Sequence, residues 1–141
     1  VLNRLEAEKP ETPQEDRLFD AMLVTDQSPE LALAAAQDRA LVKRLFERAA
    51  RDLEARERRL LRMAFVEGFT VDDIGGVYGV SRSSAGRWVK EASAALTRAV
   101  VRLAREELSL SPAQLDSWAR GLEGSIDLSL ARYLATRGEP A

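Results

Sequence analysis

Apolar residues recur along this chain with the three- and four-residue spacing of amphipathic helices, and no stretch has the alternation of a convincing strand. Ser28, Pro29 and Glu30 have the composition of a helix start, with a capping serine followed by a proline in the first turn. The periodic positions predict one helix over about residues 29–51 and a second over about 54–67. The pattern therefore predicts an all-α fold.

A short helix is predicted next, after Gly68, which ends the preceding one. Thr70 and Asp73 have the spacing of a capping box at the start of a helix over about residues 71–78. Gly75 and Gly76 lie inside this helix, where glycine is unfavourable, and a close crossing with another helix would explain them. Its buried face is expected to hold Val71, Ile74 and either Val77 or Tyr78.

A tight turn then separates the short helix from a long one over about residues 82–107. Gly79 accepts a positive φ, Val80 is expected to reach the core, and Ser81 has the side chain of a helix cap. The apolar stripe of the long helix covers about a third of its circumference. It consists of Ala85, Trp88, Val89, Ala92, Leu96, Ala99, Val100 and Leu103.

The C-terminal part of the chain has a second clear helix start. Ser111 and Gln114 have the spacing of a capping box. The apolar spacing over residues 111–137 predicts two short helices, with a break near Gly121 and Gly124. Both helices are expected to add to the core. Their buried residues are expected to be Leu115, Trp118, Leu122, Ile126, Leu130, Tyr133 and Leu134.

Charge is distributed unevenly along the chain, although the net charge is only −2. Residues 1–30 carry eight acidic and three basic side chains, a balance of −5. Residues 82–105 carry six basic side chains and one acidic, a balance of +5. The acidic, proline-broken residues 1–27 predict a solvated linker or tail, in which DRLFDAML has the pattern of a short docking turn. The basic stripe on one helix is compatible with nucleic acid as a partner.

Composition excludes several kinds of chemistry. The chain has neither Cys nor His, which removes disulfides, thiolate metal sites and the commonest general base. No apolar run is long enough to cross a membrane, and the first residues have no signal-peptide pattern. Asp72 and Asp73 are better explained as helix-cap acids than as catalytic carboxylates. We therefore expect a cytoplasmic protein that is not an enzyme and has no cofactor, no metal and no membrane partner.

The two helices around the turn at residues 79–81 have helix-turn-helix spacing. A helix that enters the DNA major groove needs short polar and basic side chains in its first two turns, because these meet phosphates and base edges. Its N-terminus also presents free N–H groups and a positive dipole. The candidate DNA-binding residues are Arg82, Ser83, Ser84, Arg87 and Lys90. The alternative is that the serines only start the helix and the basic residues only form a solvated face.

Residues 53–96 resemble region four of bacterial RNA polymerase sigma factors, most of all the extracytoplasmic-function type and related short sigma factors. The resemblance rests on a series of residues in the family's order. These are Leu53, Arg56-Glu57-Arg58, Leu60, Leu61, Gly68, Thr70, Asp72-Asp73-Ile74, Gly79-Val80-Ser81 and Arg87. Two positions depart from the family's pattern, since Gly75 replaces the usual alanine and Gly86 replaces a larger residue of the recognition helix.

The resemblance implies a function and partners. The domain would read the −35 promoter element in the major groove of double-stranded DNA, with Arg82, Ser83, Ser84 and Arg87 near base edges and phosphates. It implies that Lys90, Arg56 and Arg58 contact the DNA backbone. An apolar surface on the preceding helices would dock on the β flap of core RNA polymerase, and an anti-sigma factor is a further candidate partner.

These inferences give three segments: a linker or tail over residues 1–27, a region-four-like helix-turn-helix domain over 28–107, and a helical extension over 108–141. Within the first segment, residues 1–9 would be the last turns of a region-two domain in a longer chain, and residues 10–27 would be the linker between the two domains. The extension is expected to fill the core, with regulator binding and dimerisation as alternatives. The competing hypothesis for the whole chain is a stand-alone helix-turn-helix transcriptional regulator or a helical protein-interaction module.

Overall fold

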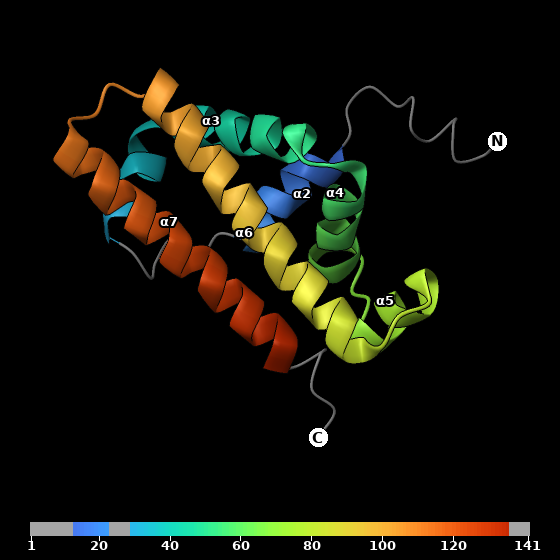
Figure 1. Cartoon of the computed structure of the whole chain (residues 1–141). Coiled ribbons are helices and arrows are strands. Elements are labelled where there is room, and N and C mark those ends of the chain that lie inside the picture. Colours follow the sequence, from blue (N-terminus) through green and yellow to red (C-terminus); the bar gives the residue numbers. More distant parts are fainter. Residues whose placement is uncertain (1–12, 23–28, 136–141) are drawn as a thin grey trace.

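A computed structural model describes the backbone of residues 13–22 and 29–135, and the side chains of residues 17–22 and 40–135. Every regular element in these ranges is helical, which confirms the predicted all-α class (Figure 1). The elements are α2 (Pro13–Met22), α3 (Pro29–Asp52), α4 (Ala55–Leu61), η2 (Arg62–Val66), α5 (Val71–Tyr78), α6 (Arg82–Glu107) and α7 (Pro112–Tyr133).

The long helix α6 is the centre of the fold, and it packs against α3, α4, α5 and α7. In Figure 1 it runs diagonally, with α5 at its N-terminal end and α7 alongside it. Its bounds agree with the predicted 82–107, because Ser81 caps it at the start. All predicted stripe residues are buried except Trp88, which is half-buried against the core.

The helices α3 and α4 agree with the two helices predicted before the motif, with one local difference. The second one begins as an α-helix but ends in the π-helical turn η2, which the apolar spacing does not indicate. The chain then reverses at Gly68, whose φ is 77°, and the Phe69 N–H donates to the Met63 carbonyl at 2.8 Å. Ser28, the predicted cap of the first helix, lies outside the described residues.

The prediction of two short helices over residues 111–137 is wrong. Residues 112–133 form one continuous helix, α7, which starts at the predicted Ser111–Gln114 capping box. Gly121 and Gly124 lie inside it, because the buried side chains on both sides of them hold the helix against the core. These side chains include Trp118, Leu122, Ile126, Leu130 and Tyr133.

The prediction of a solvated linker is also wrong for residues 17–22, although the same stretch was expected to contain a docking turn. Residues 13–22 form helix α2, and Leu18, Phe19 and Met22 are fully buried. The Phe19 ring packs edge-on against Phe46 of α3, with 5.6 Å between the ring centroids. These three apolar side chains are buried although many of their neighbours in the sequence are acidic, and this burial of apolar surface holds α2 against the core.

The helix α7 is tied to the rest of the molecule at two points by hydrogen bonds. The Ser129 hydroxyl donates to the Met22 carbonyl at 2.6 Å, at the end of α2. The Tyr133 hydroxyl donates to the Phe69 carbonyl at 2.8 Å, and its ring contacts Phe65 at 5.4 Å between centroids. One continuous core therefore includes α2, α7 and the helices between them.

At the far end of α6, Arg48 of α3 donates a hydrogen bond to the carboxylate of Glu107. This hydrogen bond raises the pKa of Arg48 above its ordinary value.

No helix in the described part of the chain is both long enough and apolar enough to span a membrane.

Candidate nucleic-acid interface

The turn between α5 and α6 depends on two glycines with different roles. Gly79 adopts φ 70°, the left-handed conformation that the sequence predicts. The backbone folds back on Gly75, whose carbonyl accepts a hydrogen bond from the Val80 N–H at 2.9 Å. A Cβ atom on Gly75 would lie 2.6 Å from the Val80 carbonyl oxygen, so only glycine fits this backbone. Gly76 has open space around it and does not serve the helix crossing.

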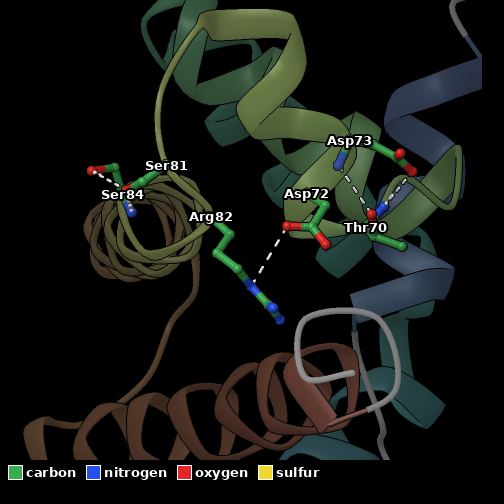
Figure 2. A network of polar contacts seen from close by, with 6 residues as sticks. All are labelled: Thr70, Asp72, Asp73, Ser81, Arg82 and Ser84. Atoms are coloured by element: carbon green, nitrogen blue, oxygen red, sulfur yellow. Dashed lines mark hydrogen bonds and ion pairs between the residues drawn. The ribbon is translucent and has the colours of Figure 1, made fainter. Parts of the chain in front are cut away.

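The helix caps are those that the sequence predicts, and Figure 2 shows both. The Asp73 N–H donates to Thr70 Oγ1 at 3.0 Å, and the Thr70 N–H donates to Asp73 Oδ2 at 3.0 Å. The Ser84 N–H donates to Ser81 Oγ at 3.1 Å at the start of α6. The Thr70–Asp73 bonds fix where α5 begins, and the Ser81 cap fixes where α6 begins. Arg82 and Ser83, the first residues of α6, are exposed.

The structure brings four of the five candidate DNA-binding residues of α6 to its exposed face: Arg82, Ser83, Arg87 and Lys90 are all exposed. Ser83, Arg87 and Lys90 lie opposite the side that holds Ala85 and the other buried residues of the stripe, whereas Arg82, the first residue of the helix, lies beside Asp72 of α5. Ser84 differs, because it is half-buried and its hydroxyl is within 3.2 Å of Ser81 Oγ.

Two carboxylates lie beside the basic residues of this face. Arg82 Nε is 3.6 Å from Asp72 Oδ1 of α5, an ion pair drawn in Figure 2. Arg87 Nε is 3.9 Å from Glu91 Oε2, one helical turn further along. The side chains of all four residues are between 42% and 64% exposed, so water screens both pairs. Exposed pairs contribute at most about 1 kcal/mol, so both arginines can exchange their carboxylates for phosphates at little cost.

The two α4 arginines that the sequence singled out have different surroundings. The guanidinium of Arg56 lies over the Trp88 ring, 4.2 Å from its centroid, so this arginine is held beside the second turn of α6. Arg58 instead donates from Nη1 to the backbone carbonyls of Arg51 at 3.0 Å and Leu53 at 3.3 Å. Arg58 therefore closes the turn between α3 and α4.

The structure adds Arg59 and Tyr78 to the site, and neither was predicted from the sequence to belong to it. The guanidinium of Arg59 lies over the Tyr78 ring at 5.8 Å from the centroid, and the Tyr78 ring packs edge-on against Trp88 at 5.7 Å. The spacing of Arg56 and Arg59, three residues apart on one helix, was the available signal that they share a face. The aromatic partners come from α5 and α6, so spacing within α4 does not indicate them.

This arrangement suits recognition of an anionic partner. A capped helix presents hydroxyl, guanidinium and ammonium groups on one face, and its other face is anchored in the core. Hydroxyl groups and guanidinium forks are the groups that bind phosphates and base edges in the major groove. Within the described residues, no cluster of Asp and Glu side chains is arranged to hold a metal ion.

Comparison with protein families found a match over residues 49–103, to the family described as Sigma-70, region 4. The matched segment covers the end of α3, all of α4, η2 and α5, and most of α6. Comparison of the chain with curated proteins and with solved structures found no match. The helices α2 and α7 lie outside the matched segment.

Proposed function

Residues 49–103 of this chain belong to the sigma-70 region 4 family, and from this premise we propose that the chain recognises the −35 element of bacterial promoters during transcription initiation. The family is a DNA-binding and regulatory one, found in sigma factors, and it implies contact with DNA and with RNA polymerase. The observation that carries the proposal is the exposed basic and hydroxyl face at the capped N-terminus of α6.

In the proposed complex, the first turns of α6 lie in the major groove. Arg87 is the best candidate for a base contact, because it is exposed in the second turn and its guanidinium fork matches the O6 and N7 atoms of guanine. Lys90 lies one turn further from the groove floor and contacts a phosphate. Arg56, on the neighbouring helix, contacts the backbone beside the groove.

The proposal includes core RNA polymerase as the protein partner, through its β flap, and the bacterial cytoplasm as the location. The alternative is a stand-alone helix-turn-helix regulator, which would bind DNA without the polymerase. The proposal does not include dimerisation through the C-terminal helix, because Trp118, Leu122, Ile126, Leu130 and Tyr133 are buried in the protein's own core.

The test is a pair of binding measurements with the full chain at low salt. Selection from a pool of randomised DNA duplexes should enrich one motif, and purified bacterial core RNA polymerase should bind the chain. Enrichment of a motif without polymerase binding would favour the regulator. A chain that enriches no motif would contradict sequence-specific recognition of any kind.

A further inference from the structure

Four side chains from three helices form an alternating cluster of cations and rings, here called the arginine–aromatic cluster: Arg56 and Arg59 of α4, Tyr78 of α5 and Trp88 of α6. Arg56 lies over Trp88, Trp88 packs edge-on against Tyr78, and Arg59 lies over Tyr78. Both arginines are exposed, whereas both rings are half-buried and packed against the core.

The ring contacts hold the two guanidinium groups without using their hydrogen-bond donors. A guanidinium that lies over a ring face is attracted by the ring quadrupole, and its N–H groups stay available at its edges. None of the ion pairs seen among the described residues involves Arg56 or Arg59. Arg58, between them in sequence, uses Nη1 for backbone carbonyls.

The position of the cluster indicates which anion it meets. The cluster adjoins the second turn of α6, because Trp88 directly follows Arg87. A major groove about 12 Å wide is filled by one helix about 10–12 Å across, so a neighbouring helix reaches only the groove rim. The anions at the rim are phosphates, and a planar guanidinium binds phosphate with two parallel hydrogen bonds.

We propose that Arg59 is a further phosphate-binding residue, and that Tyr78 positions it so that Arg56 and Arg59 grip the DNA backbone beside the groove that α6 enters. This inference rests on the proposed function, because it needs α6 to enter DNA. It adds a contact and a positioning residue that neither the sequence motif nor the family match indicates. The contact is independent of base sequence.

The experiment measures the affinity of the full chain for two duplexes, one with its selected motif and one of random sequence, between about 50 and 300 mM salt. Arg59→Gln should weaken binding to both duplexes by the same factor, roughly 3- to 10-fold near 0.1 M salt. The slope of log affinity against log salt should become shallower by about 0.9, the value for one lost phosphate contact. Arg59→Lys should restore part of the affinity, since it keeps the charge without the fork.

Matched variants separate the contact from a general charge effect and from a role in folding. Arg120→Gln removes the same charge from an exposed site on α7 and should leave the salt slope unchanged. Tyr78→Leu removes the ring face and should reproduce part of the Arg59→Gln loss without any change in charge. Tyr78→Phe should match the wild type, because the buried Tyr78 hydroxyl has no hydrogen-bond partner among the described residues. Thermal melting of each variant shows whether the fold is intact.

Two results would overturn the inference in distinguishable ways. If the wild type binds DNA and Arg59→Gln has the same salt slope as Arg120→Gln, Arg59 is only a structural link between α4 and α5. If the wild type binds neither duplex, the proposed function fails and the inference fails with it.

Discussion

At the scale of single residues, two glycines in the helix-turn-helix differ in whether their surroundings would admit a side chain. Gly75 departs from the usual alanine of the family, and the structure explains it by the close approach of the Val80 carbonyl. Gly86 also departs from the family, but a Cβ there would meet only Val71 Cγ1 at 3.9 Å, an ordinary contact. The sequence predicted a close crossing at Gly75 and Gly76, but it did not indicate that Gly75 alone serves it.

Alanine substitutions at these two glycines should therefore change stability in opposite directions. Gly75→Ala should lower the free energy of unfolding by about 1–3 kcal/mol, because the turn must move to admit the methyl group. Gly86→Ala should raise it by up to about 1 kcal/mol, because alanine is the better helix former and the space is open. Urea denaturation of both variants measures the difference. Equal destabilisation by the two substitutions would show that the α5–α6 crossing is not as described.

The ion pair between Arg82 and Asp72 gives a second prediction at this scale. Asp72→Asn removes the carboxylate whose Oδ1 lies 3.6 Å from Arg82 Nε, so that this negative charge no longer competes with a phosphate for the guanidinium. DNA affinity at low salt should therefore rise, by roughly 2- to 5-fold for a screened charge at this exposure. Asp127→Asn, at an exposed position on α7, is the control and should leave DNA affinity unchanged. Weaker DNA binding by Asp72→Asn would mean that Asp72 is needed to orient Arg82.

At the scale of elements, α5, the turn and α6 could be predicted from sequence almost residue by residue, because local signals define them. Thr70, Asp73, Gly79 and Ser81 each act on the backbone within a few residues. The continuity of α7 could not be predicted in the same way. Glycine lowers helix propensity locally, but tertiary packing of an apolar face outweighs a cost of about 1 kcal/mol per glycine.

Because its buried side chains complete the core, α7 should contribute strongly to the stability of the fold. Ile126→Ala should lower the free energy of unfolding by about 2–5 kcal/mol, because this side chain is 1% exposed and its removal leaves a cavity. The neighbouring exposed residue provides the control, and Asp127→Ala should change stability by less than about 0.5 kcal/mol. Thermal or urea unfolding of the two variants compares them. Similar small effects would indicate that α7 is only loosely attached to the other helices.

At the scale of the whole molecule, the helices α2 and α7 flank the segment that matches the sigma-70 region 4 family and complete its core. Sequence reasoning identified the basic face of α6, because charge and spacing within one helix are visible in sequence. For the buried part of α2, where Leu18, Phe19 and Met22 lie among acidic residues, the sequence predicted only a short docking turn within a solvated linker. It also missed the arginine–aromatic cluster, whose four members come from three helices.

If the N-terminal part of α6 reads DNA sequence, as we propose, the base preference of the Arg87→Ala variant tests this most directly. Wild type, Arg87→Ala and the distant control Arg120→Ala would each select duplexes from the same randomised pool. We predict that Arg87→Ala still binds DNA but loses preference at one base pair, worth about 1–3 kcal/mol, and that Arg120→Ala selects the wild-type motif. An Arg87→Ala variant that selects the wild-type motif with wild-type affinity would contradict the claim.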